Sequence, residues 1–162
     1  MSRIYIASSW KNEMVCRVMA DLLRNEGHEV DCFCDPSSGR YVFHWTELVQ
    51  RQEDLAKYDA IEFLADPRTQ RAFAEDRSWL DWADTVLLML PCGRSAHLEA
   101  GYGKGCGKRL FIYGDFLKGE FDVMYGFAAG LFREMDIDLL CNALREEPTA
   151  SNTSYTQSGG NA

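Results

Sequence analysis

The stretch RIYIASSWKNEMVCRVMADLLRNEGHEVDCFC, residues 3–34, decides the fold. It begins with a short apolar, β-prone run at Arg3–Ala7. Apolar residues then recur at helical spacing over 14–23, and Gly27 follows as a residue suited to a left-handed helix stop. From Glu29 to Cys34 apolar and polar residues alternate, as in a second strand. A strand, a helix and a strand in such a short stretch predict a βαβ unit with parallel strands and a right-handed crossover.

The rest of the chain continues to alternate strands with helices. We expect further strands at Asp84–Leu90, Leu110–Tyr113 and Leu131–Phe132, and helices at Trp45–Tyr58, Pro67–Trp82, Ala96–Lys104, Phe121–Ala128 and Met135–Arg145. The run at 84–90 is the most apolar, which predicts a central strand covered on both faces. The pattern predicts one α/β domain over residues 1–148, with a doubly wound, mostly parallel five-stranded sheet flanked by helices. Residues 149–162 are polar and uncharged, which predicts a flexible tail.

The charge balance limits the class of ligand. The 162 residues include 25 Asp and Glu but 17 Lys and Arg, a formal net charge of −8, and no basic stripe is visible. Affinity for a nucleic-acid polymer depends on clustered Lys and Arg, so we expect no such partner. A small phosphorylated ligand remains open, because one or two local cations can hold it.

Apolar runs and cysteines indicate the compartment. The longest strongly apolar run, Val86–Leu90, is too short to span a membrane, and the residues before Trp10 do not form a signal peptide. We therefore expect a cytoplasmic protein without a membrane partner, whose six cysteines are reduced and buried. The C-x-C pair Cys32 and Cys34 has neither redox nor zinc spacing. We expect no metal and no cofactor.

Three segments follow predicted strands at the sheet edge where α/β proteins bind ligands: residues 7–10, residues 91–99 and the loop after Tyr113. The middle segment reads PCGRSAHLE, a turn that leads into a helix. Backbone amides at such a start attract anions, and the Arg94 guanidinium suits a phosphate. Ser95 can cap the helix or bind a phosphate oxygen. Glu99, expected in the first helical turn, is either a carboxylate that favours the helix dipole or a catalytic group.

Other patterns in the same region are less specific. The glycines between 101 and 107 do not form G-x-G-x-x-G, so we expect them to permit close helix–sheet packing and to end the helix at Gly105 or Gly107. His97 and Glu99 do not match the zinc motif H-E-x-x-H. Asp81 and Asp84 are expected as polar residues at a helix end and a strand start, whereas the role of Asp76 stays open. The aromatic residues near strand ends form either a base-stacking wall or part of the core: Tyr5, Trp10, Phe43 and Trp45.

Four segments, in this order, resemble the nucleoside 2-deoxyribosyltransferase family, which includes relatives that hydrolyse nucleoside 5′-monophosphates. They are Ile4-Tyr5-Ile6-Ala7, Asp76-x-x-Trp79-Leu80-x-x-Ala83-Asp84, Glu99-Ala100-Gly101-Tyr102 and Asp122-Val123-Met124-Tyr125-Gly126-Phe127. The resemblance spans residues 3 to 146. It implies a flavodoxin- or Rossmann-like sheet and an enzyme that cleaves the N-glycosidic bond of a nucleoside or its 5′-monophosphate. The sugar would pass to another base or to water.

The resemblance also implies roles for individual residues. Glu99 would be the nucleophile that forms an ester with C1′ of the sugar, Asp76 would give a proton to the departing base, and Tyr5 would orient the carboxylate or the sugar. The candidate substrate-binding residues are Ala7, Ser8, Trp10, Gly93, Arg94, Ser95, Met124 and Tyr125. Met124 and Tyr125 match positions that contribute to a neighbouring subunit's pocket, which implies a homodimer or a larger homo-oligomer.

One departure from the family pattern concerns the substrate. Family members that act on free nucleosides carry an acid six positions before the nucleophile, where this chain has Gly93, followed by Arg94 and Ser95. Without that carboxylate, and with a guanidinium beside it, the turn suits a 5′-phosphate better than a hydroxyl. Two other functions stay open: a non-catalytic nucleotide-binding module on the same fold, and a TIR-like enzyme that cleaves NAD with a glutamate.

Overall fold

The sheet contains five strands that all pair in parallel. The computed structural model describes residues 1–35, 39–47, 59–116 and 122–146, together with Val49, Asp54 and Lys57. The strand order is β2-β1-β3-β4-β5. The strands are β1 (Arg3–Ala7), β2 (Glu29–Cys32), β3 (Thr85–Met89), β4 (Arg109–Tyr113) and β5 (Gly130–Phe132). The chain starts in the middle, adds β2 on one side and then returns past β1, so the predicted doubly wound α/β sheet is confirmed.

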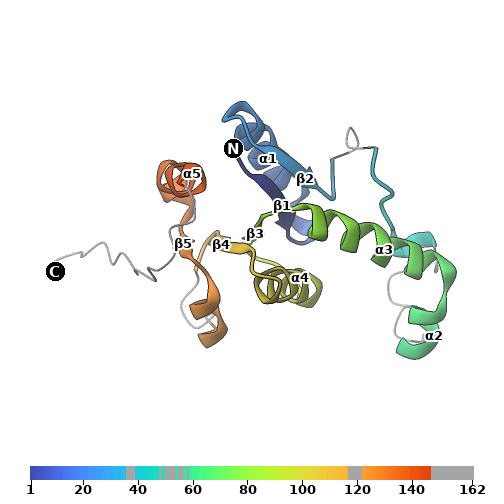
Figure 1. The fold of residues 1–162 in the computed structure, drawn as a ribbon. Helices are drawn as coiled ribbons and strands as arrows, with labels where there is room; N and C mark the ends of the chain where they lie inside the picture. The colour runs from blue at the N-terminus through green and yellow to red at the C-terminus, as the bar shows by residue number, and fades with distance from the viewer. Residues whose placement is uncertain are drawn as a thin grey trace.

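Helices cover both faces of the sheet (Figure 1). Helices α1 (Glu13–Asn25) and α5 (Ile137–Arg145) pack on one face, and α3 (Pro67–Trp82) and α4 (Arg94–Gly105) pack on the other. Because strand side chains alternate, Ile4 and Ile6 point to the first face and Tyr5 to the second. Every residue of β3 is buried, as the apolar run predicts.

Several helix boundaries follow from local chemistry. Gly27 ends the α1 region with a φ of +87°, and Gly107 follows α4 with a φ of +82°. Pro67 begins α3, where its missing N–H is not needed, and the Asp66 side chain accepts a hydrogen bond from the Arg68 backbone N–H. Of the two roles predicted for Ser95, the helix cap is wrong, because α4 begins at Arg94, two residues before the expected Ala96, and its cap position is Gly93.

Other elements differ from the prediction. Of the helix expected at Trp45–Tyr58, the structure contains a 3₁₀ turn at Trp45–Glu47, and most of the remainder lies outside the described residues. A short helix, α2 (Ala60–Ala65), was not predicted and lies at the end of α3 away from the sheet (Figure 1). The late helix is a 3₁₀ helix at Val123–Phe127, started by the Asp122 side chain, and Phe121 and the tail at 149–162 lie outside the described residues.

Gly103 sets how closely α4 approaches the sheet. A Cβ atom at this position would lie 2.5 Å from Cγ2 of Val86 on β3, which is closer than carbon atoms can pack. The prediction that a glycine permits close helix–sheet packing is therefore confirmed at Gly103. The close approach packs the last turn of α4 against the start of β3.

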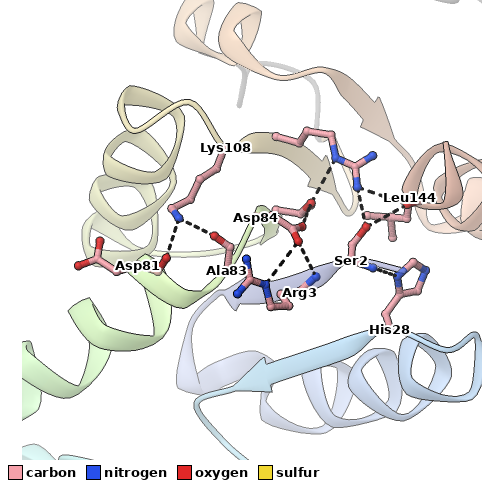
Figure 2. A network of polar contacts seen from close by, with 10 residues as sticks. Ser2, Arg3, His28, Asp81, Ala83, Asp84, Lys108 and Leu144 are labelled. Atoms are coloured by element: carbon pink, nitrogen blue, oxygen red, sulfur yellow. Dashed lines mark hydrogen bonds and ion pairs between the residues drawn. The ribbon is translucent and has the colours of Figure 1, made fainter. Parts of the chain in front are cut away.

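A polar network closes the sheet at the amino ends of the strands (Figure 2). The backbone N–H of Arg3 donates to Asp84 at 3.0 Å, and Lys108 donates to the carbonyl of Asp81 at 3.1 Å. Nη2 of Arg109 donates to the Ser2 hydroxyl at 2.7 Å, and that hydroxyl donates to the carbonyl of Leu144 at 3.3 Å. These contacts tie the start of the sheet to the end of α5.

The cysteines divide into two groups. Cys16, Cys32, Cys34 and Cys141 are buried, as expected, but Cys92 is half-buried and Cys106 is exposed where α4 ends. The expectation that all six thiols are buried is therefore wrong for these two positions, which lie at helix ends instead of strand or helix interiors. In the parts of the chain that the structure describes, no helix is long and apolar enough to cross a membrane.

Candidate active site

A pocket of about 590 Å³ opens at the carboxyl ends of β1 and β3, in the size range of small-ligand sites. Its walls come from the turn after β1, the loop after β2, the middle of α3 and the start of α4. Most of the predicted site residues line this pocket: Tyr5, Ser8, Trp10, Asp76, Gly93, Ser95 and Glu99. The parallel topology brings these distant segments to one edge.

The remaining predicted residues lie elsewhere in this chain. Ala7 is fully buried in the core beneath the pocket. Arg94, the first residue of α4, is exposed and is not among the residues that line the pocket. Met124 is 57% exposed, and the Tyr125 ring stacks on His97 with a hydroxyl-to-Nε2 distance of 3.2 Å. Their implied contribution to a neighbouring subunit's pocket stays a prediction.

Glu99 lies in the second turn of α4, not in the first as predicted, because the helix begins at Arg94. The helix dipole acts mainly within the first turn, so it does not explain why an acidic residue is found at position 99. Glu99 is one helical turn from Ala96, which is buried against the sheet, and so its side chain lies beside the pocket floor. Position therefore favours a chemical role for this carboxyl over an electrostatic role in the helix.

The surroundings of Glu99 oppose its ionisation. Burial is the largest cause and the nearby Asp76 charge is the second, and together they raise the pKa of Glu99 to about 7. A hydrogen bond from Tyr5 and the charge of Arg40 act in the opposite direction. Both the acid and the carboxylate are therefore present near neutral pH, and a nucleophilic Glu99 becomes more abundant as the pH rises.

Tyr5 and Asp76 complete the predicted catalytic group. Burial and the charges of Glu99 and Asp76 raise the pKa of Tyr5 well above its usual value, so its hydroxyl keeps its proton and can donate a hydrogen bond. Asp76 lies on α3 at the pocket rim, with 42% of its side chain exposed. Desolvation raises its pKa, while Arg40 lowers it. A carboxyl whose pKa is raised can carry a proton to a leaving group.

Arg40 is a site residue that the sequence analysis missed. Its guanidinium donates to both Asp31 and Asp76, its side chain is 1% exposed, and it lines the pocket. It lies in a stretch expected to be an ordinary loop, and its partners are distant in sequence. The one clue in the sequence was Asp31, a carboxylate within a predicted strand. It pairs in register with Tyr5 of β1, so a buried positive charge was to be expected near it.

Aromatic rings form one wall of the pocket. Of the four rings predicted to stack a base, Tyr5, Trp10 and Phe43 line it, and the side chain of Trp45 lies outside what the structure describes. Phe33 and Tyr41, which were not predicted, also line the wall. The Trp10 ring lies 5.1 Å from that of Phe33 and 4.7 Å from that of His44. Such a wall is suited to a flat, aromatic ligand such as a nucleobase.

Polar residues also line the pocket: Ser8, Ser9, Lys11 and Ser95. Ser8 donates to the carbonyl of Met89 at 2.9 Å, which fixes the turn after β1 against the end of β3. Lys11 was not predicted, and it brings a cation to the pocket where the sequence analysis expected Arg94. Among the described residues, no group of three or more His, Cys, Asp and Glu side chains is arranged to hold a metal ion.

Two solved structures are similar to this chain. A 2-deoxyribosyltransferase from Bacillus psychrosaccharolyticus is 17% identical to this chain with a TM-score of 0.56, and the match covers 91% of this chain and 93% of that one. A CMP N-glycosidase from Clostridium botulinum is 13% identical with a TM-score of 0.48, covering 88% and 97%. No family model matches the chain, and no curated protein gives a significant sequence match. The first likeness shows that the two chains share one fold over nearly their whole length.

Proposed function

We propose that the protein cleaves the N-glycosidic bond of a (deoxy)nucleoside or its 5′-monophosphate through a glycosyl ester on Glu99. The sugar then passes to another base or to water. The observation that carries this proposal is the convergence of Glu99, Asp76 and Tyr5 in one aromatic-walled pocket. The fold that the chain shares with a 2-deoxyribosyltransferase supports the proposal.

In the first step a carboxylate oxygen of Glu99 bonds to C1′ of the sugar while the bond from C1′ to the base nitrogen breaks. The electron pair of that bond leaves with the base, and Asp76 supplies the proton that makes the base a neutral leaving group. The transition state resembles an oxocarbenium ion, which the negative charge of Glu99 stabilises. Tyr5 donates a hydrogen bond that holds the carboxylate in place.

In the second step the ester is opened. A water molecule or the nitrogen of a second base attacks C1′, the ester C–O bond breaks, and its electron pair returns to Glu99. Asp76, now a carboxylate, accepts the proton that the attacking group loses. Both steps restore Glu99 and Asp76 to their starting states, so the cycle needs no cofactor.

The groups near Gly93 favour a 5′-monophosphate as the substrate. Lys11 supplies a cation, Ser8 and Ser95 supply hydroxyl donors, and Gly93 leaves no carboxylate to repel a phosphate. The amino end of α4 adds backbone N–H groups that favour an anion at the same place. Arg94 is exposed outside the pocket, so we assign the charge recognition to Lys11.

The direct test is base release from defined substrates. Wild-type protein is incubated with dCMP, dGMP and the free deoxynucleosides, with and without adenine, and free bases are separated by chromatography. We expect release from a monophosphate, and formation of a new nucleotide with adenine if the ester is transferred. Glu99→Gln should abolish release while the circular dichroism spectrum stays unchanged. Wild-type turnover in this variant would overturn the assignment of the nucleophile.

Two further results would replace the proposal. Tight nucleotide binding that survives Glu99→Gln, without turnover of any substrate by the wild-type protein, would indicate a binding module. Nicotinamide release from NAD, without base release from any deoxynucleotide, would indicate an NAD glycohydrolase. Both measurements use the same two proteins.

A further inference from the structure

Three carboxyl groups from three elements meet on one face of the sheet. Asp31 extends from β2, where it is paired in register with Tyr5 of β1, while Asp76 comes from α3 and Glu99 from α4. The side chain of Asp31 is fully buried. Burying several acids together is unfavourable, because each charge is desolvated and repels the others. The cluster therefore needs a compensating positive charge.

Arg40 lies at the centre of this cluster. Its Nη1 donates to Oδ2 of Asp31 and its Nη2 donates to Oδ1 of Asp76, so one planar guanidinium joins the strand to the helix. Its Cζ lies 5.7 Å from the centre of the Tyr5 ring. Two donors in a rigid fork fix the orientation of both carboxylates, which a lysine cannot do.

We propose that Arg40 is the positioning residue of this site: it bridges Asp31 and Asp76 and so holds Asp76 at the pocket. Its buried positive charge also allows Asp31, Asp76 and Glu99 to lie close together. The role of Asp76 and Glu99 in this inference rests on the proposed function. The bridge itself does not, because it consists of contacts within the chain. Asp31 acts here through Arg40 and not on the substrate.

The electrostatics agree with this geometry. Arg40 lowers the pKa values of Asp31, Asp76 and Glu99, against burial, which raises all three. Burial still leaves the pKa of Asp31 at about 6. Its Oδ1 accepts no hydrogen bond from any described residue, so Asp31 depends on Arg40 for its stabilisation. The titratable groups that face Glu99 are Tyr5 of β1, Asp31 of β2, Arg40 of the following loop, Asp76 of α3 and Cys92 of the turn before α4.

The first test is the pH profile of base release. In the wild-type protein kcat/KM should rise with pH as Glu99 ionises and fall at higher pH as Asp76 loses the proton that it donates. Arg40→Gln should lower kcat about 10- to 100-fold and move the midpoint of that rise upward by about half a unit to one unit. Asp31→Asn removes a negative charge and should move the midpoint downward. Arg40→Lys keeps the charge without the fork and should restore the midpoint but not the full kcat.

A matched control separates this role from general damage. Arg77, next to Asp76 on α3, pairs with Asp81 outside the pocket, so Arg77→Gln should leave the midpoint and kcat unchanged. A merely structural Arg40 would lower activity equally at every pH. An unshifted midpoint in Arg40→Gln would therefore overturn the proposal.

A second measurement does not need activity. The difference in free energy of unfolding between a protein and its Glu99→Gln variant changes with pH where Glu99 titrates. Measured in the wild-type and in the Arg40→Gln background, the midpoint of this difference should be higher in the latter. Absence of base release would then refute the proposed function alone, whereas identical midpoints would refute the role of Arg40 alone.

Removing Arg40 leaves Asp31 buried without a partner, and Arg40→Gln can fail to fold for that reason. In that case the double variant Arg40→Gln/Asp31→Asn replaces the ion pair by two neutral amides. This variant should fold and should show lowered kcat, because Asp76 has lost its fixed orientation. A double variant with wild-type kcat and pH profile would overturn the proposal.

Discussion

The environment of Glu99 affects its reactivity and the stability of the fold in opposite ways. Burial in the pocket raises its pKa to about 7, which makes the carboxylate reactive but also makes its ionisation unfavourable for the folded state. A buried carboxyl group in such a setting is expected to reduce the stability of the folded protein once it ionises. The helix does not offset this, because Glu99 lies beyond the first turn of α4.

This conflict predicts how stability depends on pH. The pKa of Glu99 is about 7 in the folded protein, against an ordinary value of 4.5, so the unfolded chain loses its proton first as the pH rises. Ionisation therefore favours unfolding between these two values and above. Glu99→Gln should match the wild-type stability below pH 4.5 and exceed it by about 1 to 3 kcal/mol at pH 8. Urea unfolding across this range measures it, and a constant difference would contradict the pKa assignment.

Lys11 should decide between a nucleotide and a nucleoside. If its ammonium binds the 5′-phosphate, Lys11→Ala should raise KM for dCMP about 10- to 100-fold and leave KM for deoxycytidine within about twofold. Steady-state kinetics with both substrates measures this. Lys104→Ala, at the far end of α4, is the control and should change neither value. An equal effect on both substrates would show that Lys11 does not bind the 5′-phosphate.

Residues of the site differ in how far sequence could identify them. Glu99, Asp76 and Tyr5 were predicted because each lies in a segment with a recognisable pattern, and all three line one pocket. Arg40 lies in a loop without a recognisable sequence motif. Its role depends on two acids, distant in sequence, that only the fold brings near it. Arg94 was predicted from its place in the turn, but it is exposed and is not among the residues that line the pocket.

At the scale of elements, the distribution of apolar residues along the sequence predicted the helices and strands that pack into the core. Helix α1 was predicted because its apolar residues recur at helical spacing, and β3 because it is a continuous apolar run that packing buries on both faces. Helix α2 was not predicted: it has six residues, none of them buried, so it leaves no periodic pattern. Its start depends on a local contact, because the Asp59 side chain caps the Ile61 backbone N–H.

Two glycines of α4 should respond in opposite ways to the same substitution. Gly103→Ala should lower the free energy of unfolding by about 1 to 3 kcal/mol, because the new methyl group overlaps Val86. Gly101 has no atom within 4 Å of an added Cβ, so Gly101→Ala should raise stability by about 0.5 to 1 kcal/mol through helix propensity. Denaturant unfolding measures both. Equal effects would contradict the close approach of α4 to β3.

At the scale of the whole molecule, several large apolar side chains of the described residues are exposed to solvent. Val123, Met124 and Phe127 of the late 3₁₀ helix are more than half exposed, as is Leu98 of α4. His97 of α4 contacts Tyr125 of the 3₁₀ helix, so these two elements form a single surface beside the turn that begins the site. A concentration of exposed apolar side chains of this kind marks an interaction surface.

We expect this surface to join two copies of the chain, as the resemblance at Met124 and Tyr125 implies. Met124→Asp places a charge in the apolar contact and should convert a dimer or larger assembly into monomers, with a loss of base release if the partner completes the pocket. Size-exclusion chromatography with light scattering measures the mass, and the same fractions are assayed for activity. Met135→Asp is the control and should change neither, because Met135 is 84% exposed in the 3₁₀ turn before α5. A wild-type protein that is monomeric yet active would show that each chain carries a complete site, because the residues lining the pocket then suffice without a partner.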